Sequence, residues 1–140
     1  MMETDVLEAL TKRLLAAARA AQRRAHAPYS SFPVGAAVLD EQGRVHAGCN
    51  VENAAYPLGT CAEASAIAAM VLAGGHKVEA LVVVGDGAGL VTPCGGCRQR
   101  LREFAAPETP VIVADRDTIR ARFTLAQLLP DSFGPENLAR

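Results

Sequence analysis

Two cysteines lie close together in the segment VTPCGGCRQR, residues 91–100. The preceding proline and the residues that follow predict the beginning of a helix. On a first helical turn Cys94 and Cys97 would face the same way. Their thiolates would meet free backbone N–H groups and the positive end of the helix dipole, which favour the ionised, metal-binding form. The pair could therefore be a redox couple, half of a structural zinc site, or part of a catalytic metal site.

Two further cysteines, Cys49 and Cys61, bear on this choice. Cys61 begins a second predicted helix in the segment GTCAEAS. A third thiolate would give zinc three protein ligands and leave a fourth position for water, as in catalytic zinc sites. Glu63 is a poor zinc ligand but suits a proton carrier for such a water. Because positions i and i+2 do not face each other on a regular helix, Cys61 must lie in the irregular start of its helix.

The other interpretations of the cysteines fit less well. A thioredoxin-like redox pair would leave Cys61 and Glu63 without a role. A purely structural zinc site would need Cys49 as its fourth ligand, whereas we expect Cys49 to point into the core as a small hydrophobe. The three histidines show no ligand spacing, and we expect surface roles for them; they are His26, His46 and His76.

The composition is that of a globular protein. The chain has 140 residues, of which 50% are hydrophobic and 21% charged, and its net charge is −1. It contains no run of like charges, so neither nucleic acid nor an anionic membrane is indicated as a partner. The start, MMETDVLEAL, lacks the layout of a signal peptide, and no apolar run approaches the roughly 18 residues of a membrane span. We therefore expect a single domain over residues 1–140 in the cytoplasm, where cysteines favour metal binding or catalysis over disulfides.

Hydrophobic periodicity predicts the elements that position these side chains. Apolar residues recur at helical spacing over residues 5–24, and the segment APYSSFP then ends the helix. Residues 34–39 and 44–49 flank the segment DEQG and predict an antiparallel hairpin. The remaining elements alternate: a helix over residues 61–73, a strand over 80–85, a helix over 93–104, a strand over 110–115 and a short helix over 123–129.

This order of elements predicts an α/β fold. Strand–helix–strand units of this length favour parallel pairing with right-handed crossovers. We expect three layers, α/β/α, with a mixed sheet of about five strands. In such sheets the helix N-termini gather at one edge, where ligands bind, and this would bring Cys61 to Cys94 and Cys97.

The motifs resemble those of a known family. The segment CAE, followed about thirty residues later by PCGGC, matches the zinc-deaminase signature in its three-cysteine form. The segment APYSSFPVGAAVLDEQGRVHAGCNVENAAY is similar to the N-terminal half of the small homotetrameric cytidine deaminases, and TPCGGCRQRLREF and LLPDSFGPENL are similar to their C-terminal half. The resemblance covers nearly the whole chain from residue 27 onward. It implies a cytidine deaminase-like fold, bound Zn²⁺, and a homotetramer with shared active sites.

The resemblance also implies a role for each matching residue. It makes Cys61, Cys94 and Cys97 the zinc ligands and Glu63 the catalytic acid and base. The positions that match substrate-binding residues are Phe32, Asn50, Glu52, Ala54, Tyr56 and Phe133. Of these, Asn50 and Glu52 would bind ribose hydroxyls, Phe32 would lie beside the base, and the last three would come from neighbouring subunits. Two alternatives stay open: Asn50 could merely end a strand, and Phe133 could dock the C-terminal tail.

One position departs from the family pattern. Many members carry an arginine directly after the glutamate, where it donates hydrogen bonds to the zinc thiolates; this chain has Ala64. Three thiolates leave a Zn²⁺ site with net negative charge, which would raise the pKa of its bound water. We expect Arg98, which follows Cys97, and the two helix N-termini to moderate that charge.

The sequence thus predicts a zinc-dependent hydrolase of pyrimidine salvage. It would convert cytidine or 2′-deoxycytidine to uridine or 2′-deoxyuridine and ammonia, with zinc-activated water and Glu63 as proton shuttle. One alternative is a deaminase of another cytosine-containing nucleoside, such as a nucleoside antibiotic; Asn50 and Glu52 argue against it, because they suit a ribose. The other is a zinc-binding module without catalysis, which would need no carboxylate beside its metal.

Overall fold

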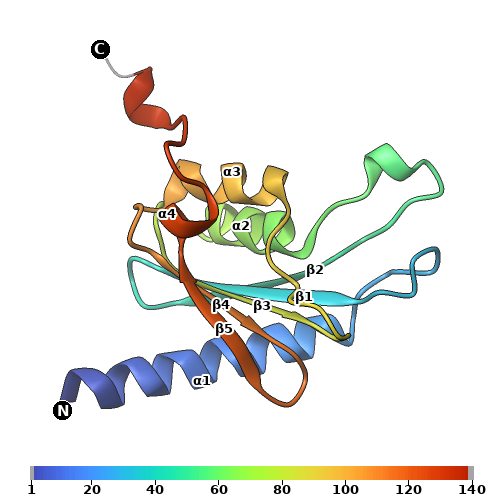
Figure 1. Ribbon diagram of the computed structural model, residues 1–140, viewed down its shortest axis with the longest axis horizontal. Helices are drawn as coiled ribbons and strands as arrows, with labels where there is room; N and C mark the ends of the chain where they lie inside the picture. Colours follow the sequence, from blue (N-terminus) through green and yellow to red (C-terminus); the bar gives the residue numbers. More distant parts are fainter. Residues whose placement is uncertain (1, 139–140) are drawn as a thin grey trace.

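A mixed five-stranded sheet lies between one long helix and a pair of shorter helices (Figure 1). The computed structural model describes residues 2–138 of the chain. The strands are β1 (Val34–Asp40), β2 (Val45–Cys49), β3 (Val78–Gly85), β4 (Pro110–Ala114) and β5 (Ile119–Thr124). Their order across the sheet is β2-β1-β3-β4-β5. The β3–β4 pair is parallel and the other pairs are antiparallel, which confirms the prediction of a mixed sheet.

The helices cover both faces of the sheet. They are α1 (Met2–Gln22), α2 (Ala62–Leu72), α3 (Gly95–Phe104) and the short α4 (Leu125–Leu128), with 3₁₀ turns η1 (Tyr56–Leu58) and η2 (Pro135–Asn137). Helix α1 covers one face, and α2 and α3 cover the other (Figure 1). Each face has its own hydrophobic core, so the predicted three-layer arrangement is confirmed. Within residues 2–138, no helix combines the length and the apolar character needed to cross a membrane.

The last helix is shorter than predicted, because a strand occupies part of its range. Phe123, expected in that helix, lies instead in β5 and pairs with Val111 of β4. Helix α4 begins only after Thr124, whose hydroxyl accepts from the backbone N–H of Gln127. The Gln127 side chain in turn accepts from the backbone N–H of Thr124. This capping box fixes the change from strand to helix at Thr124.

Two glycines let helices approach the sheet closely on its opposite faces. A β-carbon at Gly48 in β2 would lie 2.3 Å from the backbone nitrogen of Ala66 in α2. A β-carbon at Gly35 in β1 would lie 2.0 Å from the carbonyl oxygen of Ala18 in α1. Neither position can hold a side chain without moving a helix. The first contact therefore fixes the beginning of α2, which follows directly after Cys61.

A buried carboxylate holds the β1–β2 hairpin together. The Asp40 side chain is fully buried, and its Oδ2 lies 2.8 Å from Nε of Arg44 and 2.7 Å from Nε2 of His46. Oδ1 accepts from the backbone N–H groups of Gln42 and Arg44. Burial raises the pKa of Asp40, but these hydrogen bonds outweigh it and hold the pKa well below its usual range. His46, for which we expected a surface role, is partly buried against this carboxylate.

We expect Asp40→Asn to lower the free energy of unfolding at pH 7 by about 2–4 kcal/mol, because it leaves Arg44 and His46 without their carboxylate. The folded-state pKa of Asp40 is depressed, so its contribution is present above the unfolded pKa of about 3.9 and is lost as the pH falls below that value. Urea unfolding followed by circular dichroism at pH 7 and at pH 3 measures both effects. A stability difference between the two proteins that does not narrow at pH 3 would contradict the assignment.

Candidate active site

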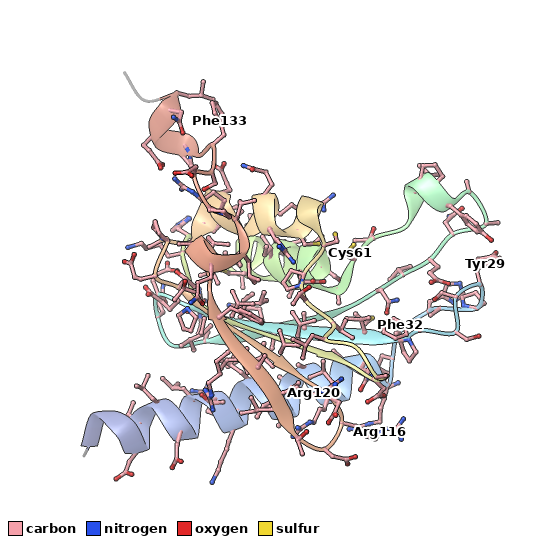
Figure 2. The ribbon with its side chains drawn as sticks, in the orientation of Figure 1. Tyr29, Phe32, Cys61, Arg116, Arg120 and Phe133 are labelled. Atoms are coloured by element: carbon pink, nitrogen blue, oxygen red, sulfur yellow. The ribbon has the colours of Figure 1, made fainter. Side chains whose placement is uncertain are left out.

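Three cysteine sulfurs gather where α2 and α3 begin (Figure 2). Cys61 directly precedes α2 and Cys94 directly precedes α3, both with extended backbone, and Cys97 lies in the first turn of α3. The sulfurs of Cys61 and Cys94 are 3.9 Å apart. All three sulfurs lie within 4.8 Å of one another. Cys61 thus occupies the irregular start of its helix, as a shared site with Glu63 requires.

The donor set fits a zinc ion. Tetrahedral zinc with Zn–S bonds of about 2.3 Å separates its ligand sulfurs by about 3.8 Å, close to the distance between Cys61 and Cys94. In the part of the chain that the structure describes, the group of potential ligands consists of three cysteines and does not include Cys49. Cys49 lies half-buried at the end of β2, opposite Gly35. Among the described residues, no fourth ligand joins the three sulfurs, so a fourth coordination position would be open, as in catalytic rather than structural zinc sites.

The three thiols differ in their readiness to ionise. Burial raises the pKa of Cys61 and of Cys97. Burial also opposes ionisation of Cys94, but hydrogen bonds from the backbone N–H of Cys97 and from the neighbouring thiols lower the pKa of Cys94 below its usual value. The backbone at the start of α3 therefore favours ionisation of Cys94, as the sequence predicted for this position.

Glu63 is buried beside the sulfurs. Its residue is only 5% exposed, and it lies in the first turn of α2. Burial raises the pKa of Glu63, while its own backbone N–H and the charge of Arg100 oppose the rise. A raised pKa suits a carboxyl group that both takes up and releases protons during a reaction. The cavity in front of it has a volume of about 170 Å³ and is lined by Val34, Asn50, Cys61, Ala62, Glu63, Val91, Thr92 and Cys94.

The guanidinium of Arg98, which we expected to moderate the charge of the thiolates, is hydrogen-bonded to oxygen atoms. Its Nε donates to the carbonyl oxygen of Pro93 at 2.7 Å, and its Nη1 donates to that of Leu128 at 2.8 Å. Its Nη2 donates to the hydroxyl of Thr92 at 3.1 Å. Arg98 therefore ties the segment before α3 to the end of α4. Its donors are engaged by oxygen atoms rather than by the sulfur of Cys97.

A hydrogen bond to the sulfur cluster is made by Arg100. Its Nη1 lies 3.7 Å from the sulfur of Cys97. We did not predict a role for Arg100, although the signal was present: residues three apart lie on the same face of a helix, as Cys97 and Arg100 do.

Asn50 connects the cavity at the sulfurs to the backbone of residues 32–34. Its side-chain oxygen accepts from the backbone N–H of Val34 at 2.8 Å, and its side-chain nitrogen donates to the carbonyl oxygen of Phe32 at 3.0 Å. Asn50 also lines the same cavity as Cys61. Phe32 is 40% exposed. The amide of Asn50 thus fixes the backbone on both sides of residue 33 at the edge of the cavity.

Glu52 fixes the other end of the same segment. Its carboxylate accepts from the backbone N–H groups of Tyr29 and Ser30, at 3.0 and 3.1 Å, and from the Ser30 hydroxyl. These hydrogen bonds lower the pKa of Glu52 below its usual value, led by the bond from the Ser30 hydroxyl. A second cavity, of about 340 Å³, is lined by Tyr29, Ser30, Glu52, Asn53, Tyr56 and Gly59.

The three remaining candidates lie on exposed extensions of the chain. Ala54 and Tyr56 belong to the loop between β2 and α2, which projects from the body of the molecule (Figure 1). Phe133 lies on the C-terminal tail beyond α3, and Figure 2 shows it well away from Cys61. Tyr56 is 73% exposed and Phe133 57% exposed. A single chain therefore does not bring these residues to the sulfurs.

Comparisons with known proteins agree with this geometry. Residues 9–113 match the family described as "Cytidine and deoxycytidylate deaminase zinc-binding region". The chain is 42% identical over 128 residues to a cytidine deaminase of Sporosarcina psychrophila, covering 91% of this chain and 94% of that one. It is 44% identical over 116 residues to one of Mycobacterium tuberculosis, covering 83% and 84%. The solved cytidine deaminase from Burkholderia pseudomallei is similar with a TM-score of 0.80 at 42% identity, over 87% of this chain and 98% of that one.

Proposed function

The chain belongs to the cytidine deaminase family of zinc-dependent hydrolases, and from this premise we propose which of its residues carry out the reaction. The reaction replaces the amino group of the cytosine ring by an oxygen from water and releases ammonia. One observation supports the assignment most strongly: Cys61, Cys94 and the buried Glu63 line one cavity, and the sulfur of Cys97 lies within 4.8 Å of the other two sulfurs.

We assign Cys61, Cys94 and Cys97 as the zinc ligands, and the bound ion would supply a Lewis acid that lowers the pKa of a water molecule. The Glu63 carboxylate accepts a proton from the attacking water. As a carboxylic acid, Glu63 then donates this proton to nitrogen 3 of the ring. It next accepts the proton of the hydroxyl group added at carbon 4 and donates it to the departing amine, which leaves as ammonia while the carbonyl forms. The burial that raises its pKa suits both roles, because a proton carrier works best with a pKa near the operating pH.

The nucleoside would be held by residues at the cavity edge. We assign the ribose hydroxyls to Asn50 and Glu52, because their polar side chains lie at the end of β2 between the two cavities. We place the base against Phe32, whose backbone Asn50 already holds. Both cytidine and 2′-deoxycytidine would fit this arrangement. A site made of reduced thiols suits a reducing compartment, so we propose a cytoplasmic location.

An absorbance assay tests the substrate class directly. Purified protein is mixed separately with cytidine, 2′-deoxycytidine, adenosine and guanosine, and the loss of the amino group is followed in the ultraviolet. We expect turnover of the two cytosine nucleosides and none of the purines. No turnover of cytidine by zinc-loaded protein would contradict the proposal. Faster turnover of a cytosine-containing nucleoside antibiotic, added as a fifth compound, would favour the alternative substrate.

We further propose a homotetramer in which neighbouring chains complete each pocket. The cavity at the sulfurs, at about 170 Å³, lies below the roughly 300 Å³ at which small-molecule sites begin. Large apolar side chains are exposed on the two projecting parts of the chain, among them Tyr56, Leu58, Phe133 and Leu138. The tail that carries Phe133 is anchored on α3, since Gln99 donates to the Phe133 carbonyl oxygen at 2.9 Å. An exposed aromatic ring on an anchored segment can line the pocket of a second chain.

We expect Phe133→Ala to weaken nucleoside binding by about 5- to 150-fold, the equivalent of the 1–3 kcal/mol that stacking on a base supplies. The Michaelis constant for cytidine and the binding constant of a substrate analogue measure this effect. Val6→Ala, which truncates an exposed apolar side chain on α1, serves as the control. Sedimentation of a fully active monomer would rule out shared pockets.

A further inference from the structure

Arg100 is the side chain that donates a hydrogen bond to the metal-binding sulfurs. Its Nη1 lies 3.7 Å from the sulfur of Cys97, one helical turn earlier on α3. Of the side-chain nitrogen atoms within residues 2–138, this is the one found within hydrogen-bond distance of a sulfur in the cluster. The Cys97 residue is fully buried. A buried thiolate without a hydrogen-bond donor or a nearby cation would be unstable. The hydrogen bond from Arg100 therefore reaches the most buried of the three cysteines.

The absence of a side chain at Gly96 leaves room for the guanidinium of Arg100. A β-carbon at Gly96 would lie 3.2 Å from Nη1 of Arg100, closer than ordinary side-chain contacts. Any larger residue at this position would press against the guanidinium that reaches Cys97. On the neighbouring helix α2, Ala64 follows Glu63, and its methyl side chain cannot donate a hydrogen bond to the sulfurs. The cation at this cluster therefore comes from α3.

We propose that Arg100 is a positioning residue of the zinc centre, which orients the Cys97 sulfur and offsets the negative charge of three thiolates. The proposal rests on the assignment of the three cysteines as zinc ligands. Arg100 would take the role of the arginine that many family members carry at the position of Ala64. In this proposal Arg100, rather than Arg98, supplies the positive charge. Groups that hydrogen-bond to metal ligands tune the metal, and their loss typically costs about 10- to 100-fold in metal affinity or activity.

The test uses cobalt(II) in place of zinc, because cobalt bound by thiolates shows sulfur-to-metal charge-transfer absorption. A hydrogen bond stabilises the sulfur lone pairs and moves this absorption to higher energy. We expect the band of Arg100→Ala to lie at longer wavelength than that of the parent protein, and its zinc affinity in a chelator competition to fall by about 10- to 100-fold. Arg100→Lys, which retains a cationic donor, should restore part of the shift.

Two further variants separate the local contact from the loss of charge. Arg122→Ala removes the same charge from β5, on the face of the sheet that α1 covers, and should leave the band unchanged. Ala64→Arg, added to Arg100→Ala, should move the band back toward the parent position. If Arg100→Ala does not fold, Arg100→Gln replaces it; it keeps a shorter, neutral donor and should shift the band in the same direction.

The outcomes distinguish this proposal from the one on which it rests. A parent protein that binds cobalt without thiolate charge transfer would overturn the zinc-ligand assignment itself. A parent protein with the band, together with an Arg100→Ala variant whose band and zinc affinity match the parent's, would overturn only the role of Arg100. The exposed arginine would then be an ordinary surface cation.

Discussion

Glu63→Gln lowers the turnover of cytidine by at least about 10²–10⁴-fold, the range expected when general acid–base catalysis is lost. Glutamine keeps the size and most of the hydrogen bonds of the buried side chain, but it cannot carry a proton from water to the base. Zinc content and nucleoside binding should largely survive, because Glu63 is not part of the group of potential ligands. Steady-state kinetics and metal analysis of the same preparation check both statements.

The matched control is Glu103→Gln, which makes the same chemical change on the exposed face of α3. We expect Glu103→Gln to retain the parent turnover. A Glu63→Gln protein that keeps most of its activity would end the assignment of Glu63 as proton carrier. A loss of zinc together with activity would instead make Glu63 part of the metal site.

The second large effect concerns the metal itself. We expect about one zinc ion per chain in the parent protein and in Cys49→Ser, and almost none in Cys94→Ser. The reason is geometric, because the sulfurs of Cys61, Cys94 and Cys97 lie within 4.8 Å of one another, whereas Cys49 does not belong to this group. Metal analysis after gel filtration measures the zinc content. Equal loss in both variants would overturn the choice of ligands.

The parts of the site that could be predicted depend on local signals. A cysteine before each helix, with Cys97 one turn after Cys94, indicated a metal site where the helix N-termini converge at one edge of the sheet. The resemblance to cytidine deaminases then supplied the full set of ligands. The hairpin around the segment DEQG was predicted correctly because its two strands and its turn are contiguous in the sequence. We predicted that Cys61 lies outside the regular part of its helix, and its extended backbone confirms this.

Strand β5 and the hydrogen-bond partners of Arg98 were not predicted. Strand β5, with the sequence IRARFT, alternates apolar and polar residues, which is the period-two signal of a half-buried strand. That signal was present in the sequence but was not used, and Phe123 was assigned to a helix instead. Arg98 was chosen because it is adjacent to Cys97 in sequence, but adjacent residues on a helix point in different directions. Its hydrogen bond to the carbonyl oxygen of Leu128 depends on the position of α4, which the sequence alone did not give.

The close contacts at Gly35 and Gly48 limit how this protein can be made more heat-resistant. Replacing glycine by alanine commonly gains about 0.4–1 kcal/mol by restricting the unfolded chain. At these two positions the added methyl group would meet helix backbone at 2.0–2.3 Å, and the overpacking, at about 1–3 kcal/mol or more, would outweigh the gain. Gly89 meets no atom within 4 Å of a β-carbon and has no positive φ. A thermostable variant should therefore be sought first in the loop after β3, with the hairpin glycines left unchanged.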